Sequence, residues 1–140
     1  MMRLASYKGT RPGLSGLFNV ATRWWLGGPY SHTELIFSDG ACASSSFLDG
    51  GVRFKRIEFD PEHWDIIECT GDEAAARAWF EAHEGDGYDV LGLIGFVWRR
   101  STHERGKWFC NEAIGAALGI PDPWRFEPVT FPILISQRVK

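Results

Sequence analysis

The chain has 140 residues, a length that predicts a single domain over residues 1–140 with a sizeable hydrophobic core. Its 44% hydrophobic and 24% charged residues are ordinary for a globular protein, and the net charge of −3 argues against nucleic acid as a partner. Seven Trp and ten Phe are many for this length, and such side chains line grooves as well as cores.

The three cysteines, Cys42, Cys69 and Cys110, are widely spaced. They form no CxxC pair or Cys/His cluster with zinc-site spacing, so we expect free thiols, no bound metal and no cofactor. The N-terminal segment has no apolar signal-peptide core, and no apolar run approaches membrane-spanning length. We therefore expect no transmembrane segment and a cytoplasmic location, with phage origin or release on lysis as routes to an outside target.

The first half of the chain reads mostly as strands. LSGLFNVATRWWLGG predicts a short helix closed by Gly27 and Gly28. YSHTELIF alternates like a strand and ends at the turn SDG, and ACASSSFL predicts a second strand paired with it through that turn. After the turn DGG, the apolar positions of VRFKRIEF change phase, which indicates a bulge near Lys55 and Arg56 or two short strands. HWDIIECT predicts a further strand.

The second half reads mostly as helices. EAAARAWFEAHEG predicts a helix that ends at its final glycine, and Thr70 and Glu73 have the spacing of a capping box at its start. YDVLGLIGFVW, residues 88–98, predicts a buried helix, with a short strand as the alternative. WFCNEAIGAALGI predicts a helix that begins near Cys110, and the tail VTFPILISQRV predicts a strand. These elements predict an α+β fold, an antiparallel β-sheet or half-barrel packed against a few helices.

Cys110 falls where a loop turns into a helix. The unpaired backbone N–H groups and the dipole of a helix N-terminus favour a thiolate there, and the same N–H groups can stabilise an oxyanion. With an imidazole in reach, such a thiol becomes an activated nucleophile. Position alone also fits a small buried hydrophobic residue, which is the commoner role of cysteine.

His32 and Glu34 occupy alternate positions of one predicted strand, so their side chains share a face. One interpretation is an edge strand with a wet polar face. The other is a catalytic imidazole held on a rigid strand. Across the turn, Ser44, Ser45 and Ser46 face His32, and we expect at least one of them to hydrogen-bond its ring.

Four pieces of the sequence carry a family resemblance. They are YSHTELIF for a Ser-His strand, SSSFLDGGVRFKRI for the strand after it, GDGYDVLGLIGF for a Tyr-Asp helix and WFCNEAIGAALG for a Cys-polar-Glu helix. In this order, over residues 30–119, the chain resembles the circularly permuted branch of the papain-like cell-wall hydrolases, the YiiX/YaeF-type amidases. In that branch the His strand precedes the Cys helix.

The resemblance implies a permuted papain-like fold and a cysteine amidase or peptidase. Cys110 is then the nucleophile and His32 the general base. Relatives commonly place a Glu or His on the strand after the catalytic His, where this chain has serines. The resemblance therefore leaves Glu34 as the group that orients the ring, with Ser44 or Ser46 as the alternative.

The expected partner is a peptide or amide substrate, and the resemblance suggests cell-wall peptide. Asn111 stands where relatives often have Ser. Two other functions remain open: a lipid acyl hydrolase or transferase similar to lecithin retinol acyltransferase, and a weakly catalytic or non-catalytic binding component of a phage or other bacterial assembly. A metal hydrolase lacks an obvious third ligand. The aromatic candidates for lining a substrate groove are Trp24, Trp25, Trp108 and Tyr30.

Overall fold

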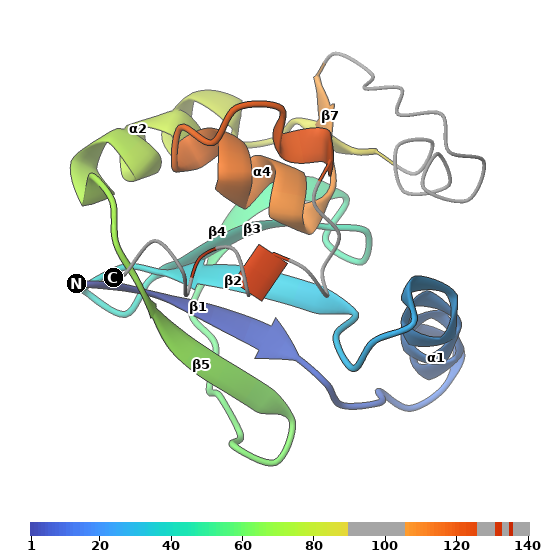
Figure 1. Cartoon of the computed structure of the whole chain (residues 1–140). Coiled ribbons are helices and arrows are strands. Elements are labelled where there is room, and N and C mark those ends of the chain that lie inside the picture. The colour runs from blue at the N-terminus through green and yellow to red at the C-terminus, as the bar shows by residue number, and fades with distance from the viewer. Residues whose placement is uncertain (90–105, 126–130, 133–134, 136–140) are drawn as a thin grey trace.

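The computed structural model is an open, seven-stranded, mostly antiparallel sheet packed against helices, and it confirms the α+β class (Figure 1). The structure describes residues 1–89, 106–125, 131–132 and 135. Its elements are β1 (Met2–Tyr7), α1 (Leu14–Leu26), β2 (His32–Ile36), β3 (Cys42–Ser46), β4 (Gly51–Lys55), β5 (Trp64–Cys69), α2 (Glu73–His83), β6 (Gly87–Tyr88), β7 (Lys107–Trp108), α4 (Cys110–Ala117) and the 3₁₀ turn η1 (Pro123–Arg125).

The strand order across the sheet is β5-β1-β2-β3-β4-β6-β7, and the β6–β7 pair is parallel. This order places β2 inside the sheet, which rules out the interpretation of His32 and Glu34 as the wet face of an edge strand. The sequence patterns above also miss β1 altogether. Leu4 of β1 packs on the helix side of the sheet, whereas Ala5 and Tyr7 pack on the other side. A strand buried on both faces lacks the apolar–polar alternation from which a strand is predicted.

Two apolar clusters cover the two faces of the sheet. Helices α2 and α4 lie over one face (Figure 1), where Leu35, Phe80 and Ile114 belong to the larger cluster. Ile36 and Trp64 belong to the smaller cluster on the opposite face. Helix α1 lies apart from α2 and α4, beyond the ends of β1 and β2 that it connects (Figure 1).

The helix boundaries agree with the sequence in part. Helix α1 ends as predicted, because Gly27 adopts the left-handed conformation, with φ 64°, that favours glycine. The capping box predicted for α2 is wrong: Asp72 is the N-cap, and its carboxylate accepts a hydrogen bond from the Ala75 N–H at 3.0 Å. Glu73 instead accepts two hydrogen bonds from Ser38. Helix α2 ends at His83, two residues earlier than predicted.

Other predictions need correction. Strand β4 ends at Lys55, and residues 56–60 form no second strand. Tyr88 belongs to β6, so a helix does not begin there, and the rest of the predicted helix over 88–98 lies beyond the described residues apart from Asp89. The predicted C-terminal strand is wrong at Phe131, Pro132 and Ile135, which are helical. Within the described ranges, no helix is long and apolar enough to cross a membrane.

A glycine brings β6 close to β4. A Cβ atom on Gly51 would lie 1.9 Å from the carbonyl oxygen of Asp86, so no other residue fits there without a backbone shift. A 2.8 Å hydrogen bond from the Val52 N–H to the same carbonyl holds the two segments together. As a result, Tyr88 of β6 meets Phe47, which follows β3, with ring centroids 5.8 Å apart.

Candidate active site

The candidate site is built around a gap between β2 and β3. The two strands pair at Leu35↔Ala43 and Ile36↔Cys42, and the ladder stops there. The Phe37 N–H donates to Ala41 on the β3 side. Because N–H directions alternate along a strand, Thr33 directs its N–H to the same side, past the end of the ladder.

Cys110 fills that gap from the helix layer. It is the first residue of α4, and its thiol receives hydrogen bonds from both the backbone N–H and the side chain of Thr33. The sulfur thus takes the position of a ladder acceptor. The Cys110 thiol is also hydrogen-bonded to the His32 ring. The thiol comes from the helix side of the sheet, whereas the imidazole belongs to the face of β2 that points away from the helices. The gap between the strands is where the two groups can meet.

His32 and Glu34 share one face of β2, as their spacing predicts. His32 Nε2 lies 2.7 Å from Glu34 Oε1, which leaves Nδ1 as the ring nitrogen that can face the sulfur. Glu34 is 1% exposed and Cys110 is 3% exposed. The three side chains form a thiol–imidazole–carboxylate series in which the thiol and the carboxylate are buried and the imidazole is 14% exposed, an arrangement like that of a cysteine-hydrolase triad.

Arg53 is a site residue that the sequence patterns miss. Its guanidinium donates to both Glu34 oxygens, at 2.7 Å and 2.5 Å, and its Nε donates to Asp49 at 2.8 Å. Lys55 donates to the second Asp49 oxygen at 2.9 Å. The β3–β4 register pairs Arg53 with Ser44, so Arg53 shares a face with Glu34 across one intervening strand. The sequence signal for this role is the charge of Arg53 between the apolar positions of VRFKRI. It can be interpreted only when the strand register is known.

These contacts set the protonation states of the triad. Burial by itself lowers the pKa of His32, but the Glu34 charge and the hydrogen bonds that the ring donates to Cys110 and Glu34 raise it to about 9. Burial raises the pKa of Glu34, yet the Arg53 hydrogen bonds and the His32 charge hold it below its usual range. Burial likewise raises the pKa of Cys110, and the His32 and Thr33 hydrogen bonds bring it below the ordinary thiol value. All three directions favour a thiolate–imidazolium pair.

The start of α4 supplies backbone donors next to the sulfur. The first turn of a helix has N–H groups without intrahelical acceptors, and these can bind an oxyanion. Glu112 Oε2 accepts the Phe109 N–H at 3.4 Å at this helix start. Asn111 is fully buried, and its Oδ1 accepts a hydrogen bond from the Thr33 hydroxyl.

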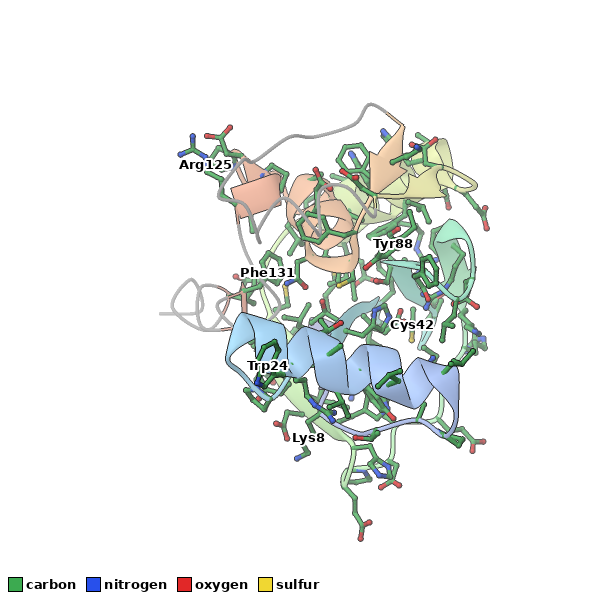
Figure 2. The ribbon with its side chains drawn as sticks, turned by 90° about the vertical axis from the view of Figure 1, so that its right-hand side faces the viewer. Lys8, Trp24, Cys42, Tyr88, Arg125 and Phe131 are labelled. Atoms are coloured by element: carbon green, nitrogen blue, oxygen red, sulfur yellow. The ribbon has the colours of Figure 1, made fainter. Side chains whose placement is uncertain are left out.

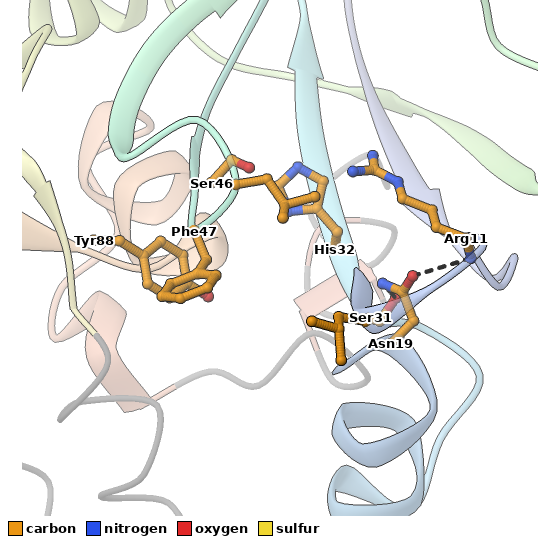
Figure 3. A pocket seen from close by; sticks show the side chains of 9 residues that line it. Arg11, Asn19, Ser31, His32, Ser46, Phe47 and Tyr88 are labelled. Carbon is orange, nitrogen blue, oxygen red and sulfur yellow. Dashed lines mark hydrogen bonds between the residues drawn. The ribbon is translucent and has the colours of Figure 1, made fainter. Parts of the chain in front are cut away.

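A pocket of about 140 Å³ opens beside the triad. Its lining includes His32 and Ser46 in the middle, Phe47 and Tyr88 on one side and Arg11 on the other (Figure 3). Cys110 does not line this pocket, but it interacts with His32 and Tyr88, which do. Burial, together with the charges of Cys110 and Asp89, raises the pKa of Tyr88 well above its usual value, so Tyr88 presents a protonated hydroxyl.

The structure separates the predicted ring orienters. The Ser44 hydroxyl donates to the Thr33 carbonyl at 2.6 Å, and the Ser45 hydroxyl donates to the Trp108 carbonyl. Ser46 lines the pocket beside His32 (Figure 3). The carboxylate of Glu34 holds the His32 Nε2.

The four aromatic groove candidates lie in different places. Trp24 is largely exposed on α1 (Figure 2), and the side chain of Trp25 falls outside the described part of the chain. Tyr30 donates to Asp65 at 2.8 Å. Trp108 donates to Asp86 at 2.9 Å and packs edge-on against Trp79, with ring centroids 4.9 Å apart. None of these described side chains lines the pocket at His32.

All three cysteines are free, as the sequence predicts. Comparison with protein-family models, curated proteins and solved structures gives no significant match.

Proposed function

We propose that the protein is a cysteine-dependent hydrolase that cleaves an amide or peptide bond, with cell-wall peptide as the favoured substrate class. The observation that carries the proposal is the series Cys110–His32–Glu34, with His32 between a buried thiol and a buried carboxylate. The order of these residues along the chain is also that of the permuted papain-like enzymes that the sequence resembles.

The proposed reaction begins with attack of the Cys110 thiolate on the substrate carbonyl carbon, which forms a C–S bond. The developing oxyanion accepts hydrogen bonds from backbone N–H groups at the start of α4. The His32 imidazolium gives its proton to the leaving amine as the C–N bond breaks. His32 then takes a proton from water, which attacks the thioester and releases the carboxylic acid and Cys110.

Two residues beside the triad have supporting roles in this proposal. Glu34 holds the His32 ring and stabilises its positive charge. Arg53 keeps Glu34 ionised in a site where burial alone favours the neutral acid. The carboxylate that relatives carry on the next strand is thus replaced by one on the His strand itself.

The direct test uses p-nitrophenyl acetate, an activated ester that reports the first step, attack of the thiolate on a carbonyl carbon. We expect a burst of p-nitrophenol and one acetyl group on the peptide containing Cys110, detected by mass spectrometry. The variants Cys110→Ala and His32→Ala remove both. Acetylation that is absent in the wild type, or that falls equally on Cys42 and Cys69, contradicts the proposal and favours a binding component of a phage or other assembly.

A lipid acyl hydrolase is the second candidate, and one observation favours it. Leu14, Phe47 and Leu48 line the pocket and are largely exposed, and α1 carries a further exposed aromatic side chain at Trp24 (Figure 2). A series of p-nitrophenyl esters separates the candidates. A kcat/KM that rises steeply with acyl length supports the lipid substrate, whereas release of new termini from cell-wall peptide fragments, with no dependence on acyl length, supports the amidase.

A further inference from the structure

The amide of Asn111, which follows Cys110 in the chain and shares the partner Thr33 with it, is incompletely bonded. Its Oδ1 accepts from the Thr33 hydroxyl, whereas its buried Nδ2 has no hydrogen-bond partner among the described residues. A buried N–H group without an acceptor is rare in folded proteins. The side chain is fully buried, so bulk water does not satisfy it either.

The Thr33 hydroxyl has two acceptors within reach. One is Asn111 Oδ1, and the other is the Cys110 sulfur, to which the Thr33 side chain is also hydrogen-bonded. A hydroxyl has a single proton and cannot donate fully to both, although its oxygen can accept a further bond. The amide as it stands therefore competes with the thiolate for that proton.

A half-turn of the Asn111 amide exchanges Oδ1 and Nδ2 and leaves the rest of the side chain in place. It gives the buried N–H an acceptor and ends the competition for the Thr33 proton. Nδ2 then donates to Thr33 Oγ1, and the Thr33 hydroxyl directs its proton to Cys110 Sγ. The atom left without a partner becomes a carbonyl oxygen, which proteins tolerate more often than an unpaired N–H. We propose that Asn111 and Thr33 form a two-bond relay that donates a hydrogen bond to the Cys110 thiolate.

In this arrangement Thr33 and Asn111 are positioning residues for the nucleophile, so the inference rests on the proposed function. Thr33 contributes its backbone N–H as well as its hydroxyl, and only the hydroxyl depends on Asn111. Among the described residues, the titratable groups at the thiol or at its contacts include His32 and Glu34 of β2, Tyr88 of β6, Asp89 after it and Glu112 of α4. The relay variants below leave these five in place.

The relay is tested by the pH dependence of iodoacetamide alkylation, followed at the Cys110 peptide by mass spectrometry. Loss of one hydrogen bond to a charged group should raise the Cys110 thiol pKa by about 1. We expect this rise in Thr33→Val. Asn111→Leu, a neutral variant of similar size, removes the Nδ2 donor and should also raise the pKa, whereas removal of an amide that only accepts from Thr33 would free the hydroxyl for the thiolate and lower the pKa. Thr33→Ser keeps the hydroxyl and should retain the wild-type pKa.

Ser45→Ala is the matched control. Ser45 is also fully buried, and its hydroxyl donates to the Trp108 carbonyl instead of to the thiol. This variant should leave the Cys110 pKa unchanged even if it lowers the melting temperature. An unchanged pKa in Thr33→Val, or an unchanged or lowered pKa in Asn111→Leu, overturns the relay. Should Thr33→Val fail to fold, the direction of the pKa change in Asn111→Leu decides between the two orientations of the amide.

The relay and the proposed function fail in different ways. If the wild-type Cys110 pKa is low and rises in the relay variants, but no ester or amide is cleaved, the relay stands and the hydrolase proposal falls. If the wild type forms the acetyl-enzyme and the relay variants keep its alkylation profile, the hydrolase stands and the relay falls.

Discussion

Glu34 Oε1 lies 2.7 Å from His32 Nε2, and the same oxygen accepts a hydrogen bond from Arg53 at 2.5 Å. One buried carboxylate is therefore shared by an imidazole on its own strand and a guanidinium from β4. The shared oxygen couples the basicity of the ring to the stability of the sheet. A change at either partner should consequently alter both properties, and this expectation can be measured.

The reactivity of the three cysteines should differ sharply. We expect iodoacetamide to modify Cys110 at neutral pH much faster than Cys42, because His32 lowers the Cys110 pKa whereas burial and the Glu34 charge raise the Cys42 pKa. In His32→Ala the Cys110 rate at neutral pH should fall at least tenfold, as expected when the thiol pKa returns toward its ordinary value. The rate is read for each cysteine peptide by mass spectrometry. Equal rates at all three cysteines would show that no activated thiol exists.

The charge of Glu34 should control the titration of His32. In Glu34→Gln the negative charge that raises the His32 pKa is lost, so that pKa should fall well below about 9. Histidine ring signals in NMR spectra report the change directly. The pH above which Cys110 loses its imidazolium partner should fall with it.

His63, which lies just before β5 and pairs with Asp60, is the internal control in the same spectra. Its ring signal should not differ between the wild type and Glu34→Gln. A His32 titration that is unaffected by Glu34→Gln would mean that the carboxylate does not interact with the ring in solution.

Removal of the guanidinium should destabilise the fold. Arg53→Met leaves the buried Glu34 carboxylate with fewer partners, and breaking a buried ion pair from one side costs about 3–5 kcal/mol. Denaturant unfolding measures the loss. Lys55→Met is the matched control: Lys55 is half exposed and binds Asp49 beyond Arg53, so its loss should cost about 1 kcal/mol or less. Similar losses in the two variants would contradict a special role for Arg53.

The stability of the protein should fall at alkaline pH through His32. Its folded pKa of about 9 lies above the ordinary value of 6.5. The stabilisation is therefore fully present below pH 6.5 and is lost as pH rises through about 9. Cys110 has the opposite sign because its pKa is lowered, so the measurement is made in Cys110→Ala. In that variant the His32 pKa keeps the contribution of Glu34 and loses that of Cys110, so the loss of stability should begin at a lower pH than in the wild type.

Thermal unfolding of Cys110→Ala from pH 6 to 10 should show this loss, and the additional change His32→Ala should flatten the curve. At acid pH, the lowered pKa of Glu34 gives stabilisation that is present above the ordinary carboxyl pKa and is lost as pH falls through the folded value. An alkaline loss that persists unchanged without His32 would assign it to another group.

Local sequence was enough for part of the fold. The C-terminal end of α1 follows from the left-handed turn at Gly27, and the β2–β3 hairpin follows from the turn at residues 38–40. Where a cap had competing candidates, the sequence was ambiguous: Asp72, two residues after Thr70, takes the cap of α2. At the C-terminus, the apolar pattern around Phe131 suits a buried helix as well as a strand, and the residue is helical.

The sequence by itself determined that His32 and Glu34 share a face and that Cys110 begins a helix, because strand periodicity and helix starts depend on residues close together in the chain. Only the tertiary structure decided that Cys110 reaches His32, that Glu34 is buried and that Arg53 binds it. Those facts depend on which strands are adjacent, in which register, and where the β2–β3 ladder ends. Such long-range pairings arise from the packing of both faces of the sheet, which no short stretch of sequence encodes.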